Sequence, residues 1–305
     1  MNRKITIIGA GSVGATVAFM MAVKGLAAEI VMIDINEKKA LGEAMDIRQG
    51  TAFTAPVKIY AGRYEDAAGS DIVVITSGLG RKPGQTRLEL AQVNVGIMKS
   101  IATEISRVCP DAMYVIVSNP VDVLTYVFNK VTDVPESHII GTGTLLDTFR
   151  LRRILSEQTG LPRTAIHALV MGEHGDSSMI PYSALRLDGR PADAVPGFDP
   201  EEALRRTRDT GMDIIDGKGS TEFGIGQAAA FLINGILRGE TRTLPLSTLL
   251  RGEYSVQDIP CGVPCVIGPR GIERVVEIPL KGQEKSALDA SLRVLDTHRR
   301  LALTK

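Results

Sequence analysis

Three glycines follow directly on an apolar run near the N-terminus, and their spacing constrains the fold more than any other feature. Lys4–Ile8 has the composition of a buried strand, and Gly9, Gly11 and Gly14 then match G-x-G-x-x-G at the start of a helical stretch. In a strand–turn–helix unit the first glycine allows a tight turn, the second lets backbone approach a pyrophosphate, and the third lets helix pack on strand. The motif predicts a dinucleotide site; the alternative is a glycine-rich turn without a ligand.

A carboxylate stands where a dinucleotide site needs one. Asp34 ends a second apolar run, about 20 residues after Gly14, where an acidic side chain accepts hydrogen bonds from the adenosine ribose hydroxyls. The same charge would repel a 2′-phosphate, so the sequence favours NAD over NADP. An ordinary acidic residue at a strand end is the alternative, but the order of strand, turn, helix, strand and carboxylate favours the cofactor.

The first half of the chain alternates short apolar runs with amphipathic stretches. This alternation predicts an α/β fold, a doubly wound parallel sheet with helices on both faces. From about Gly141 the pattern becomes a mixture of helices and Pro/Gly-rich strands, so we place a first domain at 1–140 and a second at 141–305. The segment 190–200 is expected to be a surface connection. The expected strands of the first half are Lys4–Ile8, Ile30–Asp34, Val57–Ala61, Ile72–Thr76 and Met113–Val117, and its expected helices are Val13–Lys24, Glu37–Arg48 and Leu88–Val108.

The charge balance limits the partners. Lys and Arg number 35, and so do Asp and Glu, so no chain-wide field favours nucleic acid or an anionic membrane. The apolar run 13–23 is too short to span a bilayer, which needs about 20 apolar residues. The strand before it is unlike a signal peptide. We therefore expect a cytoplasmic protein whose partners are small molecules and copies of itself.

The cysteines also favour a cytoplasmic protein. Cys109, Cys261 and Cys265 are an odd number in a chain that is large enough to form a core. No His or Cys pair stands beside them at zinc-like spacing. We expect buried, reduced thiols and no metal site.

One histidine stands between glycines after an apolar run. His174 lies in the segment Gly172–Asp176, and a histidine at the tip of a sharp turn can reach a substrate. On the helix expected from 144 to 158, Asp147 and Arg150 are three residues apart and share one face. Such a pair is usually a solvated ion pair, and it gains a chemical role only if a histidine lies across from it.

Five ordered motifs carry a wider resemblance. They are Gly9-Ala10-Gly11-Ser12-Val13-Gly14, Thr86-Arg87-Leu88, Val117-Ser118-Asn119-Pro120-Val121-Asp122, Leu146-Asp147-Thr148 with Arg150, and Gly172-Glu173-His174-Gly175-Asp176. In order and spacing they are similar to those of the NAD-dependent L-lactate/malate dehydrogenase family, over essentially the whole chain. The resemblance implies a Rossmann domain followed by an α+β substrate domain. It also implies NAD as cofactor, a small 2-oxo or 2-hydroxy acid as substrate, and a homo-oligomer, either a tetramer or a dimer.

The resemblance also gives roles to the polar residues of these motifs. Arg150 would hold the substrate carboxylate through two parallel hydrogen bonds. His174 would give a proton to the carbonyl oxygen, while Asp147 fixes its tautomer and favours its charged form. Arg87, after the glycine-rich loop 78–86, would stabilise the charge that develops on that oxygen when the loop closes over the substrate.

Asn119 and Thr221 are assigned by the resemblance alone. Asn119 would contact the substrate oxygen and the nicotinamide side of the cofactor, and Thr221 would line the substrate pocket. Otherwise Asn119 before Pro120 could be only a turn, and Thr221 only a polar residue at the start of a helix.

The substrate signals conflict. Arg81 occupies the family's specificity position, where malate dehydrogenases usually carry Arg and lactate dehydrogenases Gln. A second guanidinium would pair with the second carboxylate of oxaloacetate and stay unpaired beside the methyl group of pyruvate. Thr221 and the residues around His174 and Arg87 instead resemble lactate dehydrogenases. We favour reduction of pyruvate to L-lactate, with malate dehydrogenase as the alternative and a non-catalytic NAD-binding protein as a remote one.

Arg152 and His167 suggest regulation. They match positions at which bacterial lactate dehydrogenases bind fructose 1,6-bisphosphate across a subunit interface. Two phosphates need several cationic groups, and a symmetric interface would gather two from each subunit. The alternative is a helix-surface Arg and a strand-end His with no ligand.

Overall fold

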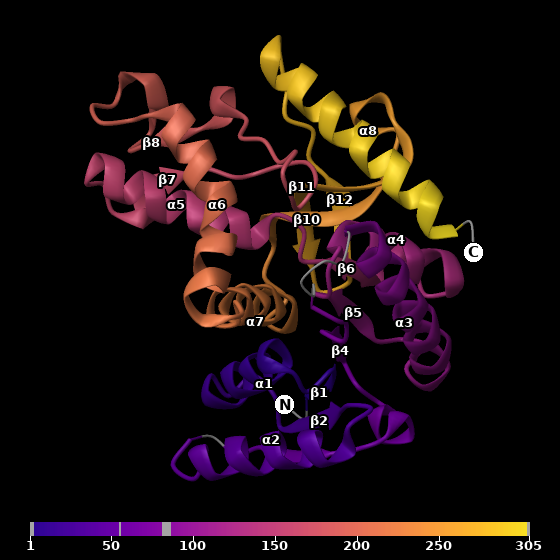
Figure 1. Cartoon of the computed structure of the whole chain (residues 1–305). Coiled ribbons are helices and arrows are strands. Elements are labelled where there is room, and N and C mark those ends of the chain that lie inside the picture. The colour runs from indigo at the N-terminus through magenta and orange to yellow at the C-terminus, as the bar shows by residue number, and fades with distance from the viewer. Residues whose placement is uncertain (1–2, 55, 81–86, 304–305) are drawn as a thin grey trace.

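One large sheet runs through the molecule, with helices packed around it (Figure 1). The computed structural model describes residues 3–54, 56–80 and 87–303, with the backbone alone for residues 87–90. Within that part of the chain the large sheet has nine strands, and a separate small sheet has three. The order across the large sheet is β12 (Gly271–Val275), β11 (Gln257–Gly268), β10 (Arg242–Arg251), β6 (Ile139–Gly141), β5 (Met113–Ile116), β4 (Ile72–Ile75), β1 (Lys4–Ile8), β2 (Glu29–Ile33) and β3 (Lys58–Ala61).

The strands from β6 to β3 are all parallel. The chain starts at β1 in the middle, moves outward through β2 and β3, and then returns to β4 on the other side. Ligands of such sheets bind at the carboxyl ends of the strands beside this switch point. Every strand predicted for the first half lies within one residue of its observed bounds, and the predicted doubly wound parallel sheet is confirmed.

Four helices accompany these strands. They are α1 (Ser12–Val23), α2 (Glu37–Gly50), α3 (Arg87–Val108) and α4 (Val121–Val131). Asn36 caps α2, its Oδ1 accepting the Lys39 N–H at 3.1 Å, which explains why that helix begins where it does. The sequence did not predict α4, because residues 121–128 are all buried and rich in β-branched and aromatic side chains, a composition that also suits a buried strand.

The second half of the chain extends the same sheet. β10 and β11 form a long antiparallel pair, and β10 joins the parallel half where Ser247 pairs with Gly141 of β6. The boundary between residues 140 and 141 stays a prediction, since β6 crosses it and belongs to the one sheet. The helices of this half are α5 (Leu145–Thr159), α6 (Pro200–Lys218), α7 (Phe223–Leu237) and α8 (Gln283–Leu303).

A small antiparallel sheet packs beside α5 and α6. Its strands are β7 (Ile166–His167), β8 (Arg186–Leu187) and β9 (Arg190–Pro191). The expectation of a plain surface connection over 190–200 is therefore wrong in part. Ala192 and Val195 are buried in a core cluster with residues of α5, because burial of small apolar side chains outweighs the turn-forming composition around them.

The two halves share one core. Buried residues of β1, β2, α1, α7, β10 and β11 belong to the same hydrophobic cluster. A Cβ on Gly226 of α7 would lie 2.5 Å from Thr16 Cγ2 of α1, so a glycine is needed for these two helices to approach this closely.

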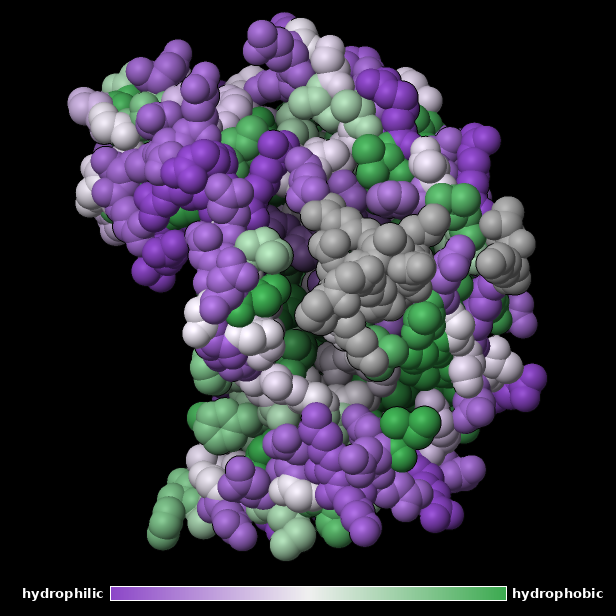
Figure 2. Space-filling model, in the orientation of Figure 1, coloured by the Kyte–Doolittle hydropathy of each residue, from purple (hydrophilic) through white to green (hydrophobic). Residues whose placement is uncertain are grey.

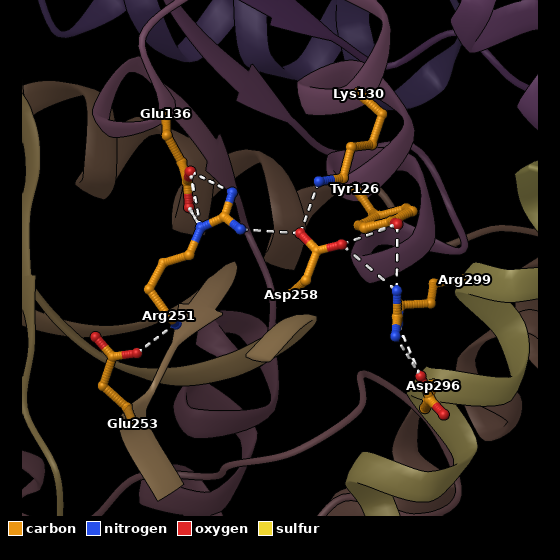
Figure 3. A network of polar contacts seen from close by, with 8 residues as sticks. All are labelled: Tyr126, Lys130, Glu136, Arg251, Glu253, Asp258, Asp296 and Arg299. Carbon is orange, nitrogen blue, oxygen red and sulfur yellow. Dashed lines mark hydrogen bonds and ion pairs between the residues drawn. The ribbon is translucent and has the colours of Figure 1, made fainter. Parts of the chain in front are cut away.

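A network of charges joins α4, β10, β11 and α8 (Figure 3). Asp258 is its centre: it accepts Lys130 Nζ at 2.6 Å and Arg251 Nη1 at 3.0 Å on one carboxylate oxygen. Its other oxygen accepts the Tyr126 hydroxyl at 3.2 Å and Arg299 Nη1 at 3.5 Å. We call this set of residues the Asp258 network; its further members are Glu136, Glu253 and Asp296.

The three thiols are free and buried, as predicted. Burial raises the pKa of Cys265 to about 12, so that thiol stays protonated. In the described ranges, no helix has the length and apolar character needed to cross a membrane.

Candidate active site

The glycine-rich turn lies at the carboxyl end of β1. Gly9 has φ +107°, which L side chains rarely adopt, and a Cβ there would lie 2.6 Å from Ser77 N. A Cβ on Gly14 would lie 1.8 Å from Gly9 O, so only glycine lets α1 start this close to the strand. Space around Gly11 is open where a Cβ would stand. Since Gly11 has no side chain to cap α1, the N–H groups of its first turn are available to an anion.

Asp34 holds this turn in place. One oxygen accepts the Ala10 N–H at 2.7 Å and the other accepts the Asn36 N–H at 2.8 Å. Each carboxylate oxygen can accept a further donor, so the half-buried carboxylate can support the turn and still bind ribose hydroxyls.

The structure brings the predicted histidine to the predicted ion pair. Asp147 Oδ2 lies 2.6 Å from His174 Nδ1, and Asp147 Oδ1 lies 3.0 Å from Arg150 Nη1. The Asp147 side chain is 8% exposed and that of Arg150 12%, so this is not the solvated pair that i,i+3 spacing usually gives. His174 Nε2 has no hydrogen-bond partner among the residues that the structure describes.

The segment that carries His174 is anchored by separate elements. Gly172 and Gly262 of β11 exchange two backbone hydrogen bonds, at 2.8 and 3.0 Å. The next N–H, that of Glu173, donates to Ser291 Oγ of α8 at 2.7 Å. The His174 N–H donates to Asp122 Oδ2 of α4 at 2.9 Å. Consecutive backbone groups are therefore fixed from three directions, which leaves the ring little freedom to move.

The surroundings favour a charged imidazole. The charge of Asp147 raises the pKa of His174, against the opposing effect of burial, and the hydrogen bond between them raises it further. Burial works against ionisation of Asp147, but the charges of His174 and Arg150 hold the pKa of that carboxyl below its usual range. A protonated ring with a free Nε2, next to a guanidinium, can donate a proton to a substrate whose carboxylate the guanidinium holds.

Asn119 lies at the carboxyl end of β5, close to the same edge of the sheet. Its Oδ1 accepts the Val121 N–H at 3.3 Å, and its backbone carbonyl accepts Asn94 Nδ2 at 2.8 Å. The Asn94 side chain also bonds both backbone groups of Leu79, at 2.9 and 3.2 Å. Buried Asn94 thus ties the first residues of the glycine-rich loop to Asn119.

Comparison with known proteins connects this geometry to a family. Residues 3–141 match the model of the lactate/malate dehydrogenase NAD binding domain, and residues 144–303 match that of the lactate/malate dehydrogenase alpha/beta C-terminal domain. The chain belongs to the lactate/malate dehydrogenase family. The resemblance predicted from five motifs is confirmed, and with it the NAD cofactor and the class of oxidoreductases that act on a CH–OH group.

Individual relatives match over nearly their whole length. L-lactate dehydrogenase 1 of Clostridium acetobutylicum is 40% identical over 302 residues, 96% of each chain. L-lactate dehydrogenase of Acetivibrio thermocellus is 39% identical over 297 residues, 95% of this chain and 94% of the relative. The structure of the minor L-lactate dehydrogenase from Enterococcus mundtii, in a ligands-bound form, superimposes with a TM-score of 0.96 at 33% identity, covering 100% of this chain and 99% of that one.

The cofactor site fits the family's NAD. The open space at Gly11 and the uncapped start of α1 would hold the pyrophosphate. The Asp34 carboxylate would hold the ribose. Across the described residues no group of three or more His, Cys, Asp or Glu is arranged to hold a metal ion.

The remaining predicted residues divide into two groups. Thr221 lies half-buried between α6 and α7, and Asn119 is exposed, so both can reach a ligand. Arg81 lies outside the described residues, and Arg87 begins α3 with its side chain outside them. The roles of Arg81 and Arg87 stay predictions.

The two residues of the predicted regulatory site are neighbours in the fold. Arg152 Nε of α5 donates to Ala168 O at 3.0 Å, directly beside His167 of β7. His167 is exposed and Arg152 is half-buried, and burial lowers the pKa of that guanidinium. Their proximity is consistent with a shared anion site at the surface.

Sequence reasoning missed residues that support the site. Gly211 of α6 faces Arg150: a Cβ there would lie 3.3 Å from Nη2, so glycine leaves room for the guanidinium. Asp122 and Ser291 bind the backbone beside His174. Asp122 stands in one of the five motifs but received no role, although it is the one acid in the apolar segment 121–128; Ser291, on a helix far along the chain, gave no signal.

Proposed function

We propose that this chain is an L-lactate dehydrogenase, which reduces pyruvate to L-lactate with NADH and catalyses the reverse reaction. The joined pair of His174 and Asp147, 2.6 Å apart beside Arg150, carries the proposal. The relatives described above are named L-lactate dehydrogenases, which favours pyruvate within the family.

Each residue has one task in this reaction. NADH, when bound, supplies the hydride that adds to the carbonyl carbon of pyruvate. Arg150 holds the substrate carboxylate with two parallel hydrogen bonds that a lysine could not make. His174 gives its Nε2 proton to the carbonyl oxygen, and Asp147 stabilises the charged ring until then. Arg87 stabilises the charge that develops on that oxygen. NADH, pyruvate and one proton become NAD and L-lactate.

Malate dehydrogenase is the second candidate because of Arg81. If this guanidinium faces the substrate, a second carboxylate gains a charge-assisted hydrogen bond, worth about 1.5 to 3 kcal/mol or roughly 10- to 100-fold in discrimination. If it faces solvent, Thr221 and the rest of the pocket decide, and pyruvate is preferred.

Steady-state kinetics with pyruvate and oxaloacetate side by side separates the candidates. We expect a higher kcat/KM for pyruvate, with a measurable rate on oxaloacetate that Arg81→Gln removes. A wild-type preference for oxaloacetate, reversed by Arg81→Gln, would make the chain a malate dehydrogenase. No turnover of either acid would leave a protein that binds NAD without this activity. NADH should be preferred over NADPH, and replacing Asp34 by serine should narrow that preference.

We further propose activation by fructose 1,6-bisphosphate. Arg152 and His167 from each of two subunits would supply four phosphate-facing side chains. The activator should lower the apparent KM for pyruvate and raise the oligomer mass, and Arg152→Gln should abolish both effects. If saturating bisphosphate changes neither quantity, the regulatory assignment is wrong and the catalytic one is unaffected.

We also propose that the enzyme is a homo-oligomer, tetramer or dimer, in the cytoplasm. Large apolar side chains are exposed on α1, α2 and α6, and Figure 2 shows separate apolar patches among polar surface where α1 and α2 lie. Helices α1 and α2 pack against each other, and a large contiguous apolar patch on a soluble protein usually marks an interaction site. The free, buried thiols suit a reducing compartment. The exposed apolar side chains include Phe19 and Val23 on α1, Leu41 and Met45 on α2, and Met212 on α6. Light scattering coupled to size-exclusion chromatography gives the mass of the oligomer directly.

A further inference from the structure

A second carboxylate lies against the catalytic histidine, on its backbone side. Asp122 is 3% exposed, and both of its oxygens are engaged. Oδ2 accepts the His174 N–H at 2.9 Å, and Oδ1 accepts the Ser247 hydroxyl at 2.6 Å. One side chain therefore links α4, β10 and the segment that carries the proton donor.

The fold is adapted to hold this carboxylate. Asp122 stands in the first turn of α4, where the helix dipole favours a negative charge. Ser247 is fully buried, and Gly141 and Gly143 let its strand approach. A Cβ on Gly143 would lie 2.5 Å from Ser247 N, and one on Gly141 would lie 2.7 Å from Ser247 Cβ.

Stability alone does not account for an acid at this position. Burying a carboxylate is costly even when it is hydrogen-bonded, and a polar but neutral side chain could make the same two bonds. Burial raises the pKa of Asp122 to about 6, although the Ser247 hydroxyl and the His174 N–H lower it. At pH 7 the group is therefore mostly ionised, and its charge acts on an imidazole that must carry a proton.

We propose that Asp122 is a positioning residue for proton transfer, which fixes the backbone of His174 and adds a second negative charge that helps to keep its ring protonated. This inference rests on the proposed function, in which His174 is the acid. Asp147 sets the ring orientation through Nδ1, and Asp122 acts from the opposite end of the residue.

Several other groups act on the same ring and must be counted. Asp147 and Arg150 face it from α5, and the charge of Arg150 opposes protonation while that of Asp147 favours it. Glu173 in the His174 segment and the Cys261 thiol of β11 interact with Asp122. The protonated thiol adds no charge, because burial raises its pKa well above the usual value.

Asp122→Asn isolates the charge. The amide oxygen can still accept the His174 N–H, and the amide nitrogen can donate to Ser247 Oγ, so both hydrogen bonds survive. We expect the pKa of His174, measured by NMR titration of the four histidines, to fall by about one pH unit. The same shift should appear in kcat/KM for pyruvate. The variant should approach wild type well below pH 6, where wild-type Asp122 is itself mostly protonated, and fall about tenfold below it at alkaline pH. NADH affinity should not change.

Two further variants separate charge from packing. Thr125→Val changes another buried hydroxyl of α4, which donates to Val121 O, and should leave the His174 titration unchanged. Ser247→Ala removes one donor to Asp122, so the pKa of the carboxyl should rise and the effect of Asp122→Asn should be reproduced in part near neutral pH.

The NMR readout does not depend on the substrate. If pyruvate is not turned over, the proposed function fails, and the titration of His174 still tests this inference. Identical His174 titrations in wild type and Asp122→Asn would overturn it, and so would an equal shift in Thr125→Val. A variant that binds NADH normally but loses turnover equally at every pH would reduce Asp122 to a purely structural role.

Discussion

Helix α4 takes part in two charged clusters that differ in what they leave unpaired. Its first turn supplies Asp122 to the active site, and its later turns supply Tyr126 and Lys130 to the Asp258 network. In the Asp258 network each oxygen of Asp258 is shared between two donors from different elements. In the active site His174 keeps Nε2 without a partner in the described part of the chain. Both oxygens of Asp258 are thus engaged by two donors each, whereas the imidazole of His174 keeps one ring nitrogen open to a substrate.

The ion pair of the active site is also more deeply buried than the pair of Asp258 and Arg251 in the Asp258 network. The side chains of Asp147 and Arg150 are 8% and 12% exposed, while those of Asp258 and Arg251 are 27% and 42% exposed. Charges in contact with water are screened, so ion pairs among them are worth little. Buried charges interact strongly, and removing one partner leaves the other uncompensated. The charges of the active site therefore interact more strongly than those of the Asp258 network, and removing one of them should cost more free energy of unfolding.

The largest difference should be in turnover. His174→Gln removes the proton donor and should lower kcat by about 10²- to 10⁴-fold, with NADH affinity nearly unchanged in a fluorescence titration. Asp258→Asn removes the central charge of the Asp258 network and serves as the control; it should keep kcat within about twofold of wild type. Loss of cofactor affinity equal to the loss of turnover would contradict the role given to His174.

The second difference should be in stability at neutral pH. Asp147→Asn leaves Arg150 and His174 facing each other without the charge between them. It should lower the free energy of unfolding by about 3 kcal/mol, the lower end of the range for breaking a buried pair. Urea titrations at one fixed protein concentration measure it, because an oligomer's stability depends on concentration. A loss of unfolding free energy below about 1 kcal/mol would mean that solvent screens the charges of the active site as it screens exposed ion pairs.

What the sequence predicted depended on local patterns. The glycine motif, the carboxylate of Asp34, and the pair of Asp147 and Arg150 each span a few residues or one βαβ unit, and the structure or the family match bears out the fold that they imply. The parallel strands were recognisable because strands buried on both faces are continuous apolar runs. The meeting of His174 with Asp147 rested on the family resemblance, since 27 residues separate them.

What it did not predict depends on distant contacts. The His174 N–H meets Asp122 across 52 residues, and Lys130 meets Asp258 across 128. No periodicity encodes such pairs, because they arise only when the sheet has formed. Segment 190–200 was misjudged for a related reason: its composition favours turns, but the buried positions of Ala192 and Val195 are fixed by α5 and the small sheet.

The third difference should be in the salt dependence of stability when the central carboxylate of the Asp258 network is removed. Asp258→Asn leaves Lys130, Arg251 and Arg299 without their shared anion, but water reaches all three side chains. We expect the free energy of unfolding to fall by about 1 kcal/mol in dilute buffer and by less in concentrated salt, which screens exposed charges. Asp147→Asn should lose as much in salt as without it. Equal salt sensitivity of the two variants would remove the distinction between the clusters.

The smallest effect is a pH dependence that only the active site should show near neutrality. Asp147 raises the pKa of His174, so the folded state holds that proton more tightly than the unfolded chain. The resulting stability is fully present below about pH 6.5, the ordinary histidine value, and is lost as pH rises through the folded pKa. The pKa of Asp258 is instead lowered by its cations, against its burial, so its contribution is present above the ordinary value of its carboxyl and is lost only in acid.

Between pH 6 and pH 9, the contributions of the two clusters to stability should therefore depend differently on pH. The difference in unfolding free energy between wild type and His174→Gln should shrink by about 1 kcal/mol over that range, since a shift of one pH unit in a pKa corresponds to about 1.4 kcal/mol. The difference between wild type and Asp258→Asn should stay constant there and decrease only below pH 4. Urea titrations of the three proteins at pH 6, 7.5 and 9 decide it. A constant difference for His174→Gln would show that the folded and unfolded chains bind this proton equally, and Asp147 would then orient the ring without favouring its charge.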